Sequence, residues 1–462
     1  MQELNLGYHY PIIYWNTACL IINAGANEEL DDNKSTQYGK IAKAIANFKQ
    51  RSIIVDRPLI NEAKFSFVPD EKNNRIIFSF KGLCGIGDDI ARAIVEHQPY
   101  GSFEDFCKRM VDTKIIGTAK MIILIKAGCF NELDSPDRME TMKKFLSRNV
   151  FTPTDKLTMQ QFNSALEYDI FPKEMETMIR TKNFKAYALH ESFFLKNIID
   201  EGKKVPKKGY HDRYFALDER GTEFLMEHFN TCIVGTKEDG VIISEKLFNK
   251  EWDALIQPLK DYMALPETLQ LYNQKKLDST MESYASGSLE QWDMESLSYY
   301  PDRHELWNLN EPKYGVVDYN SLPEIPEVYE HTTRRVRGEI KHFPKYKIFR
   351  LAGTVLDSDN NKHLVSLLTN HGVVTCKYNK GQYSYYNKRI SEQTPAGKKK
   401  VLEESWFKRG SKIIVCGYRR EDQFVIMKYP DTVYTHTTNR IEEIYNDGTI
   451  LAQTDRKKVG EG

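Results

Sequence analysis

The chain has 462 residues, in which 65 Lys and Arg balance 65 Asp and Glu, so the net charge by itself favours no class of partner. A hydrophobic share of 40% and an aromatic share of 12% suffice for packed cores, which excludes a largely disordered protein, and the length fits about three domains. Seven scattered cysteines without a CxxC pair argue against structural zinc, and no apolar run approaches the roughly 20 residues of a membrane span, so we expect a cytoplasmic protein with no membrane partner.

Residues 1–74 are expected to be mainly helical. Apolar residues at helical spacing predict helices over 11–25 and 34–50. The stretch 52–61 is predicted to be extended, because the ring of Pro58 removes a backbone donor and blocks a helix.

A glycine-bearing turn separates a short predicted strand, RIIFSF (75–80), from the next predicted helix, which begins at Asp88. Gly85 and Gly87 lie in this turn, and the backbone N–H groups from Cys84 to Asp88 are expected to point outward and to attract an anion. Phosphate is the common ligand of such a turn. The alternative is an ordinary strand–turn–helix joint, in which glycine only supplies a positive φ.

Two further amphipathic helices are predicted over 102–110 and 117–130, each with a capping residue at its start, Ser102 and Thr118. Residues 150–270 mix helical pieces with short strands, and no motif emerges there.

From about residue 334 the pattern changes to short β-runs punctuated by Gly, Asn or Asp, namely IFRLAGTVLD, HLVSLLT, VVTCKYN, KIIVCGYRR and QFVIMKY. DSDNNK (357–362) is predicted to be a hairpin turn. Five short strands with an interruption before the fourth favour a small Greek-key barrel such as an OB-fold.

Four stretches resemble segments of one known family and occur in the same order as in that family. They are LGYHYPIIYWNTACL, IIVDRPLINEAKFSF, the region from FKGLCGIGDDIARAIV to TAKMIILIKAGCFNEL, and WDMESLSYYPDRHEL (292–306). They resemble the end of the fingers, an extended segment, a tandem helix-hairpin-helix module and the stretch before the OB-fold. Together they resemble the C-terminal half of the alpha subunit of bacterial DNA polymerase III, a C-family replicative polymerase. The chain departs from the family pattern at four positions, where the family has Pro, Ser, Gly and Pro: Arg57, Ala63, Ser298 and Glu305.

The resemblance implies a multidomain α+β fold, with a mainly helical N-terminal part that holds a helix-hairpin-helix module and a small C-terminal OB-like β-barrel. The expected domains are the end of the fingers (1–74), the tandem helix-hairpin-helix module (75–146), a divergent mixed α/β insert (147–272), a helical linker (273–333), the OB-fold (334–435) and a C-terminal extension (436–462).

The helix-hairpin-helix resemblance implies that the glycine turn contacts the phosphates of duplex DNA. Such contacts do not depend on the DNA sequence. The candidate residues of this hairpin are Lys81, Gly82, Cys84, Gly85, Ile86, Gly87 and Arg92. The alternative is that the hairpin only packs the fingers against the second half of the chain.

The predicted barrel is the second candidate, because twelve Lys and Arg stand against three Glu between Lys377 and Arg420, in a chain that is neutral overall. Interleaved aromatic residues suit single-stranded DNA, with cations along the backbone and rings under the bases. The candidate residues are Lys377, Tyr378, Lys388, Arg389, Lys398, Lys399, Lys400, Trp406, Lys408, Arg409, Arg419 and Arg420. The alternative is a solvated loop at 398–400 and rings that belong to the core.

No catalytic carboxylates or metal ligands are assigned on this chain, because the family's catalytic carboxylates lie on the palm, upstream of everything resembled here. The resemblance therefore implies a component of a DNA-directed DNA polymerase, a nucleotidyltransferase. A palm-bearing partner chain would hold Mg²⁺, and a sliding clamp is a further candidate partner. Such split polymerases are typical of phages, which implies the host cytoplasm. A catalytically silent DNA-binding accessory protein on a host replisome and a purely structural module are the alternatives.

Overall fold

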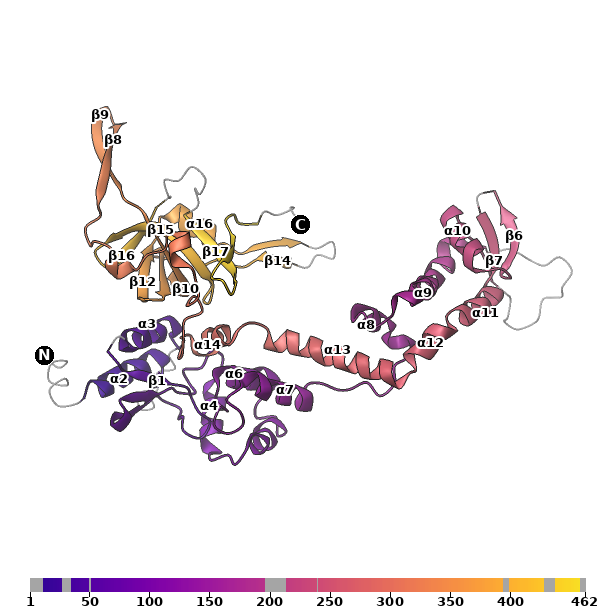
Figure 1. Ribbon diagram of the computed structural model, residues 1–462, viewed down its shortest axis with the longest axis horizontal. Coiled ribbons are helices and arrows are strands. Elements are labelled where there is room, and N and C mark those ends of the chain that lie inside the picture. Colours follow the sequence, from indigo (N-terminus) through magenta and orange to yellow (C-terminus); the bar gives the residue numbers. More distant parts are fainter. Residues whose placement is uncertain are drawn as a thin grey trace. The chain divides into compact units, whose positions relative to one another are not determined.

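The computed structural model describes residues 11–26, 35–49, 51–195, 213–238, 240–393, 399–427 and 437–457. The chain forms two compact units, and unit 1 combines Met1–Phe145 with Ala285–Gly462, whereas unit 2 is Leu146–Tyr284. The predicted fold class is confirmed, since a mainly helical N-terminal part and a C-terminal β-barrel are both present (Figure 1). The candidate residue Lys398 lies outside the described residues.

Unit 1 begins with two helices and a small sheet. α2 (Ile12–Ala24) and α3 (Tyr38–Lys49) form within the two predicted helical ranges. In the sheet, β3 (Arg75–Ile77) pairs in parallel with β1 (Ile54–Asp56) and antiparallel with β2 (Val68–Asp70).

The helical hairpins follow, as α4 (Asp88–Glu96), α5 (Phe103–Phe106), a π-helical turn (Cys107–Val111), α6 (Thr118–Ala127) and α7 (Arg138–Asn149). Ser102 caps α5 as predicted, because its side chain accepts the amide of Asp105. The prediction that Thr118 caps α6 is wrong: Gly117 is the N-cap, and Thr118 is the first helical residue.

Five strands close the barrel: β10 (Phe349–Asp359), β11 (Leu364–Thr369), β12 (Gly372–Lys377), β15 (Lys412–Arg420) and β16 (Gln423–Ile426). Their order is β10-β11-β12-β16-β15, and β15 returns to pair with β10. β12 and β16 are parallel, whereas the other neighbours are antiparallel. Each of the five predicted β-runs therefore supplies one barrel strand.

Other elements complete unit 1: α14 (Leu289–Leu297), α15 (Glu311–Tyr314), β8 (Val328–Val336), β9 (Glu339–Tyr346), α16 (Lys380–Asn387), β13 (Ile390–Gln393), β14 (Lys399–Glu403), β17 (Thr438–Ile444) and β18 (Ile450–Gln453). α16 and the β13–β14 hairpin fill the interruption before the fourth barrel strand. β8 and β9 form a hairpin of their own, so the barrel begins at Phe349 and not near residue 334. β17 extends the barrel sheet beside β15, so the part of the expected C-terminal extension that is described joins the sheet.

α3 packs directly on the barrel. Gly39 lies so close to β10 that a Cβ at this position would collide with the Cβ of Asp357. Ala42, further along α3, belongs to a buried cluster with Met294 of α14 and Leu356 of β10. The first helices, α14 and the barrel thus share an interior within unit 1.

Unit 2 contains a four-stranded antiparallel sheet and helices. The sheet order is β4-β5-β7-β6, with β4 (Phe194–Leu195), β5 (Tyr214–Ala216), β6 (Ile233–Lys237) and β7 (Gly240–Ser244). The helices are α8 (Phe162–Glu167), α9 (Glu176–Ala188), α10 (Glu219–His228), α11 (Glu245–Leu255), α12 (Gln257–Met263) and α13 (Pro266–Ala285). Phe215, Leu225 and Phe248 are in the core formed by the sheet, α10 and α11.

Short 3-10 turns occupy Glu71–Asn73, Met159–Gln161, Lys173–Met175, Glu191–Phe193 and Tyr319–Ser321. No helix in the described part of the chain has the length and apolar character of a membrane span.

Candidate nucleic-acid interface

Two glycine N-caps open α4 and α6 to solvent. Gly87 (φ −82°, ψ 165°) precedes α4, and Gly117 (φ −83°, ψ 164°) precedes α6 with nearly the same backbone conformation. Both glycines are exposed, and no heavy atom lies within 4 Å of where a Cβ would stand. A phosphate can therefore approach the backbone at either helix start, where unpaired N–H groups and the helix dipole favour an anion.

In the first hairpin, the turn at 82–87 that precedes α4, some backbone amides form hydrogen bonds within the protein. The amide of Cys84 donates to the carbonyl oxygen of Ser296 at the end of α14 (2.8 Å), and the amide of Ile86 donates to Leu83 (3.3 Å). The amides of Gly87 and Asp88 have no acceptor in the described part of the chain. The amide of Gly85 also has a protein acceptor, the Tyr38 hydroxyl (3.4 Å), so the prediction that all amides from Cys84 to Asp88 face outward is wrong for Cys84, Gly85 and Ile86.

Three of the predicted hairpin residues lie beneath the surface, namely Gly82, Cys84 and Ile86. Burial raises the pKa of the Cys84 thiol, although the nearby Arg409 charge and the Ser298 hydroxyl oppose the shift. Cys84 is thus an interior thiol that contacts the Ser298 hydroxyl beneath the turn.

The cations of the first hairpin also have protein partners. The Lys81 ammonium pairs with the Asp88 carboxylate, and the Arg92 guanidinium lies over the Phe65 ring, 4.0 Å from its centroid. Gly85 adopts φ +83°, which explains why glycine stands at this position. The Asp88 charge at the start of α4 is therefore offset by Lys81, whereas Asp89 is exposed.

The second hairpin, which precedes α6, was predicted as part of the tandem module but was not proposed as a DNA contact, and fewer negative charges surround its helix start. The first turn of α6 contains no acidic residue. Lys120 in that turn donates from Nζ to the carbonyl oxygen of Gly85 (2.5 Å), so its ammonium lies between the two hairpins. The repeat of an Ile-Gly pair at Ile86-Gly87 and Ile116-Gly117, each before a helix, was the available signal.

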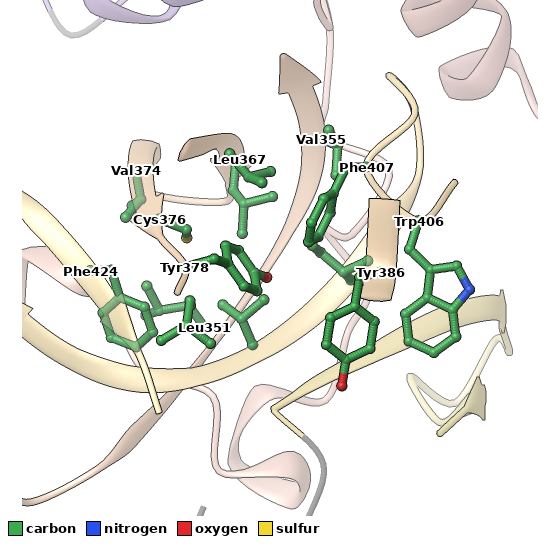
Figure 2. Packing of buried hydrophobic residues seen from close by; sticks show 14 of the residues in the cluster. Leu351, Val355, Leu367, Val374, Cys376, Tyr378, Tyr386, Trp406, Phe407 and Phe424 are labelled. Atoms are coloured by element: carbon green, nitrogen blue, oxygen red, sulfur yellow. The ribbon is translucent and has the colours of Figure 1, made fainter. Parts of the chain in front are cut away.

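The barrel encloses most of its aromatic residues. Tyr378 and Trp406 are 1% and 0% exposed and point into the core, beside Tyr386 and Phe407 (Figure 2). The prediction that Tyr378 and Trp406 contact DNA is therefore wrong, because neither ring presents a face to solvent. Tyr385 is the ring of α16 that is exposed, at 51%.

The basic residues of the barrel divide into two groups. Some are committed to protein partners: Lys377 donates to the carbonyl oxygen of Lys362, Arg389 pairs with Glu404, and Arg419 binds Glu324 and the carbonyl oxygen of Leu322. Lys388, Lys400 and Lys408 are exposed, and so are Arg389 and Arg420, although Arg420 donates to the Tyr346 hydroxyl (3.4 Å). The side chain of Lys399 is not described.

Tyr38 brings the two predicted sites together. Its hydroxyl donates to the carbonyl oxygen of Leu83 (3.3 Å) and accepts the amide of Gly85 (3.4 Å). The Arg409 guanidinium lies over the Tyr38 ring, with Cζ 4.6 Å from the centroid. The barrel cation Arg409 thus lies next to the first hairpin, although more than 300 residues separate them in the sequence.

The Asp357–Asp359 pair was expected in the hairpin turn, but both residues belong to the end of β10. Asp359 accepts the amides of Asn361 and Lys362, which turns the chain toward β11. Throughout the residues that the structure describes, no three His, Cys, Asp or Glu side chains gather as metal ligands.

Comparison with known proteins gives a family model for the helical hairpins and relatives for the chain. Residues 52–140 match a family model described as a helix-hairpin-helix motif. Two curated relatives, "Probable DNA polymerase YorL" of Bacillus subtilis (strain 168) and "DNA-directed DNA polymerase" of Bacillus phage SPbeta, are each 40% identical over 467 residues. The match covers 99% of this chain and 34% of each relative, so the chain spans about a third of their length.

Proposed function

We propose that this chain is the DNA-holding part of a replicative polymerase related to the polymerase III alpha subunit. The observation that carries the proposal is the pair of open glycine N-caps, Gly87 and Gly117, with the Lys120 ammonium between their hairpins. Two such helix starts bind successive phosphates of one strand without reading its sequence. The names of the two relatives and the order of the resembled segments support the same function.

The barrel contributes a second DNA contact in this proposal. Because most aromatic rings of the barrel lie in its core, positive charge would be the main contact with single-stranded DNA, through Lys388, Lys400, Lys408 and Arg409. Among the proposed barrel contacts in the described residues, Tyr385 is the one exposed ring. Arg409 adjoins both surfaces, so a template leaving the hairpins passes directly to the barrel.

Nucleotide transfer in this proposal belongs to a palm-bearing polypeptide, which would correspond to parts of the relatives that this chain does not cover. That polypeptide would supply the carboxylates that hold Mg²⁺, and the present chain would supply binding and positioning. A sliding clamp is a further proposed partner.

The test is duplex binding by variants that fill the open helix starts. Gly87→Val and Gly117→Val place a side chain where phosphate would approach, and neither glycine has a positive φ that would strain the variant. Each loses the contacts to one phosphate, so we expect affinity to fall about tenfold, or about 1.4 kcal/mol. Fluorescence anisotropy with a short mixed-sequence duplex measures this.

Gly101→Val is the matched control, because Gly101 is exposed, lies in open space and belongs to the same module beyond the other end of α4. It should bind duplex like the parent chain. Equal affinity of all three variants and the parent would show that the hairpins are structural joints. Gly85→Val is unsuitable, since φ +83° and the Ile123 side chain at 3.2 Å would impair folding.

A further inference from the structure

A free-standing β-hairpin projects from the barrel. β8 and β9 pair antiparallel from Val328↔Tyr346 to Val336↔Glu339, and Figure 1 shows the two strands extending away from the other barrel strands. The strands are exposed along nearly their whole length on both faces. We call residues 328–346 the arm.

The arm is anchored at its base and unsupported beyond it. The Tyr346 ring packs on Tyr418 of β15, with centroids 4.5 Å apart, and its hydroxyl accepts from Arg420 (3.4 Å). An isolated two-stranded hairpin is marginally stable in water, because neither face is buried. A hairpin of this length therefore suits a partner that covers it.

The charge of the arm indicates the charge that its partner should have. Three arginines gather at the tip, Arg334 and Arg335 at the end of β8 and Arg337 in the turn. In the described part of the chain, none of the three guanidinium groups has a hydrogen-bond or ion-pair partner. The two acidic residues of the arm are already paired, Glu330 with Lys345 (2.6 Å) and Glu339 with Lys341 (3.9 Å).

Two features of the tip cost stability in the free protein. Arg334 lies directly opposite Lys341, and like charges at facing positions weaken a strand pair. Arg337 occupies the first position of a two-residue turn with φ 53°, where Asn, Asp or Gly is preferred over a long side chain. A polyanion against the tip would remove the repulsion between Arg334 and Lys341.

The distribution of the arginines favours duplex DNA over a single strand. Cross-strand pairing puts Arg334 and Lys341 on one face and Arg335 and Ile340 on the other, with Arg337 at the tip. A two-stranded ribbon fits the major groove, where phosphates flank both of its faces. The arginine tip, residues 334–341, has no Phe, Tyr or Trp on which an unpaired base would stack, and the exposed rings of the arm, Tyr329 and Phe343, lie nearer its base.

We propose that the arm inserts its arginine tip into a groove of duplex DNA bound to this chain. The inference rests on the proposed function, because it names a further contact with the same duplex. The test compares the full chain with a triple variant, Arg334→Gln, Arg335→Gln and Arg337→Gln. The matched control is Arg51→Gln, Lys72→Gln and Lys143→Gln, which removes the same charge from exposed positions elsewhere in unit 1.

Duplex affinity should fall about tenfold or more in the arm variant, and the slope of log K against log salt should become shallower by about 3 if each arginine neutralises one phosphate. The control should stay within about twofold of the parent. Hydrogen exchange should also show that duplex protects the amides of residues 328–346.

Parent-like affinity and slope in the arm variant, with Gly117→Val still impaired, would overturn the arm inference and leave the proposed function intact. Arm amides that stay unprotected with duplex bound would overturn it equally and would favour a protein partner. A parent chain that binds no duplex would overturn both.

Discussion

Asp293 receives two guanidinium groups in the interior of unit 1. Its Oδ1 accepts from Arg57 (2.6 Å) and Arg138 (2.5 Å), and its Oδ2 accepts a second bond from Arg57 (2.9 Å). Arg57, where the resembled family has a proline, thus joins the extended segment 52–61 to α14. Ser298, where the family has a glycine, ends α14 with φ 67°, a conformation that glycine adopts most easily.

We expect Asp293→Ala to destabilise unit 1 by about 3–5 kcal/mol, because the buried Arg138 loses its carboxylate partner and the half-buried Arg57 keeps only one, the exposed Asp302. Chemical denaturation followed by tryptophan fluorescence measures the loss. Glu295→Ala on the same helix removes an exposed carboxylate that pairs with Lys126, and should cost about 1 kcal/mol or less. A loss equally small for Asp293→Ala would contradict the structural role assigned to it.

His304 is held in one neutral tautomer. Its Nε2–H donates to the carbonyl oxygen of Leu368 (2.9 Å), and its Nδ1 accepts the amide of Leu306 (2.9 Å). Burial lowers its pKa to about 4, and the hydrogen bond to Leu368 only partly opposes this shift. Protonation would convert Nδ1 into a donor that faces another donor.

The stability of unit 1 should therefore depend on His304 between pH 6.5 and 4. Because the folded-state pKa lies below the unfolded value of 6.5, the unfolded chain binds more protons, and stability falls as the pH falls through this window. The slope from this group is about 1.4 kcal/mol per pH unit at most. His304→Gln should show a shallower slope in denaturation series at several pH values, and parallel slopes would refute the assignment.

α4 and α6 begin with similar backbones and opposite charge. Two aspartates open α4, whereas the first turn of α6 carries Lys120 and no acidic residue. A carboxylate at a helix start stabilises the helix but repels phosphate. The charges at the start of α4 therefore stabilise that helix, whereas those at the start of α6 favour binding of an anionic ligand.

Thr118→Asp should give the start of α6 an acidic charge like that at the start of α4. We expect a stability gain of about 0.3–1 kcal/mol from the helix dipole, together with a severalfold loss of duplex affinity. Asp89→Asn should move both quantities in the opposite direction. Denaturation and anisotropy measured on the same preparations decide this, and a Thr118→Asp chain that binds duplex normally would remove α6 from the interface.

Over the whole molecule, an apolar stripe on α2 stands out. Ile12, Trp15 and Ile22 are 53%, 42% and 64% exposed and lie on one face, whereas Leu20 on the other face is fully buried. Such a stripe marks a contact surface. In the proposed function its partner is the palm-bearing polypeptide.

We expect the 462-residue chain alone to incorporate no nucleotide, and to restore primer extension when mixed with a palm-bearing polypeptide from the same genome. Ile12→Glu, Trp15→Glu and Ile22→Glu together should abolish co-purification and extension while duplex binding persists. Leu451→Glu, at an equally exposed position on β18, should change neither. Metal-dependent extension by the isolated chain would refute this division of labour, and failure to restore extension would favour the accessory-protein alternative.

The sequence by itself determined the local elements of this protein. Short β-runs punctuated by Gly, Asn or Asp placed each of the five barrel strands, and the Gly-Asp boundary at 87–88 placed the start of α4. These signals are local, because strand and helix periodicity and helix capping depend on residues within a few positions of one another.

Tertiary structure alone decided which side chains remain available to a ligand. Tyr378 and Trp406 sit in a basic, aromatic stretch that suits DNA, yet both rings fill the barrel core. The Cys84 amide is taken by Ser296, and Arg409 lies beside the first hairpin only because Tyr38 connects them. Burial and pairing of this kind depend on segments that are distant in the chain, so they cannot be predicted from a local pattern of residues.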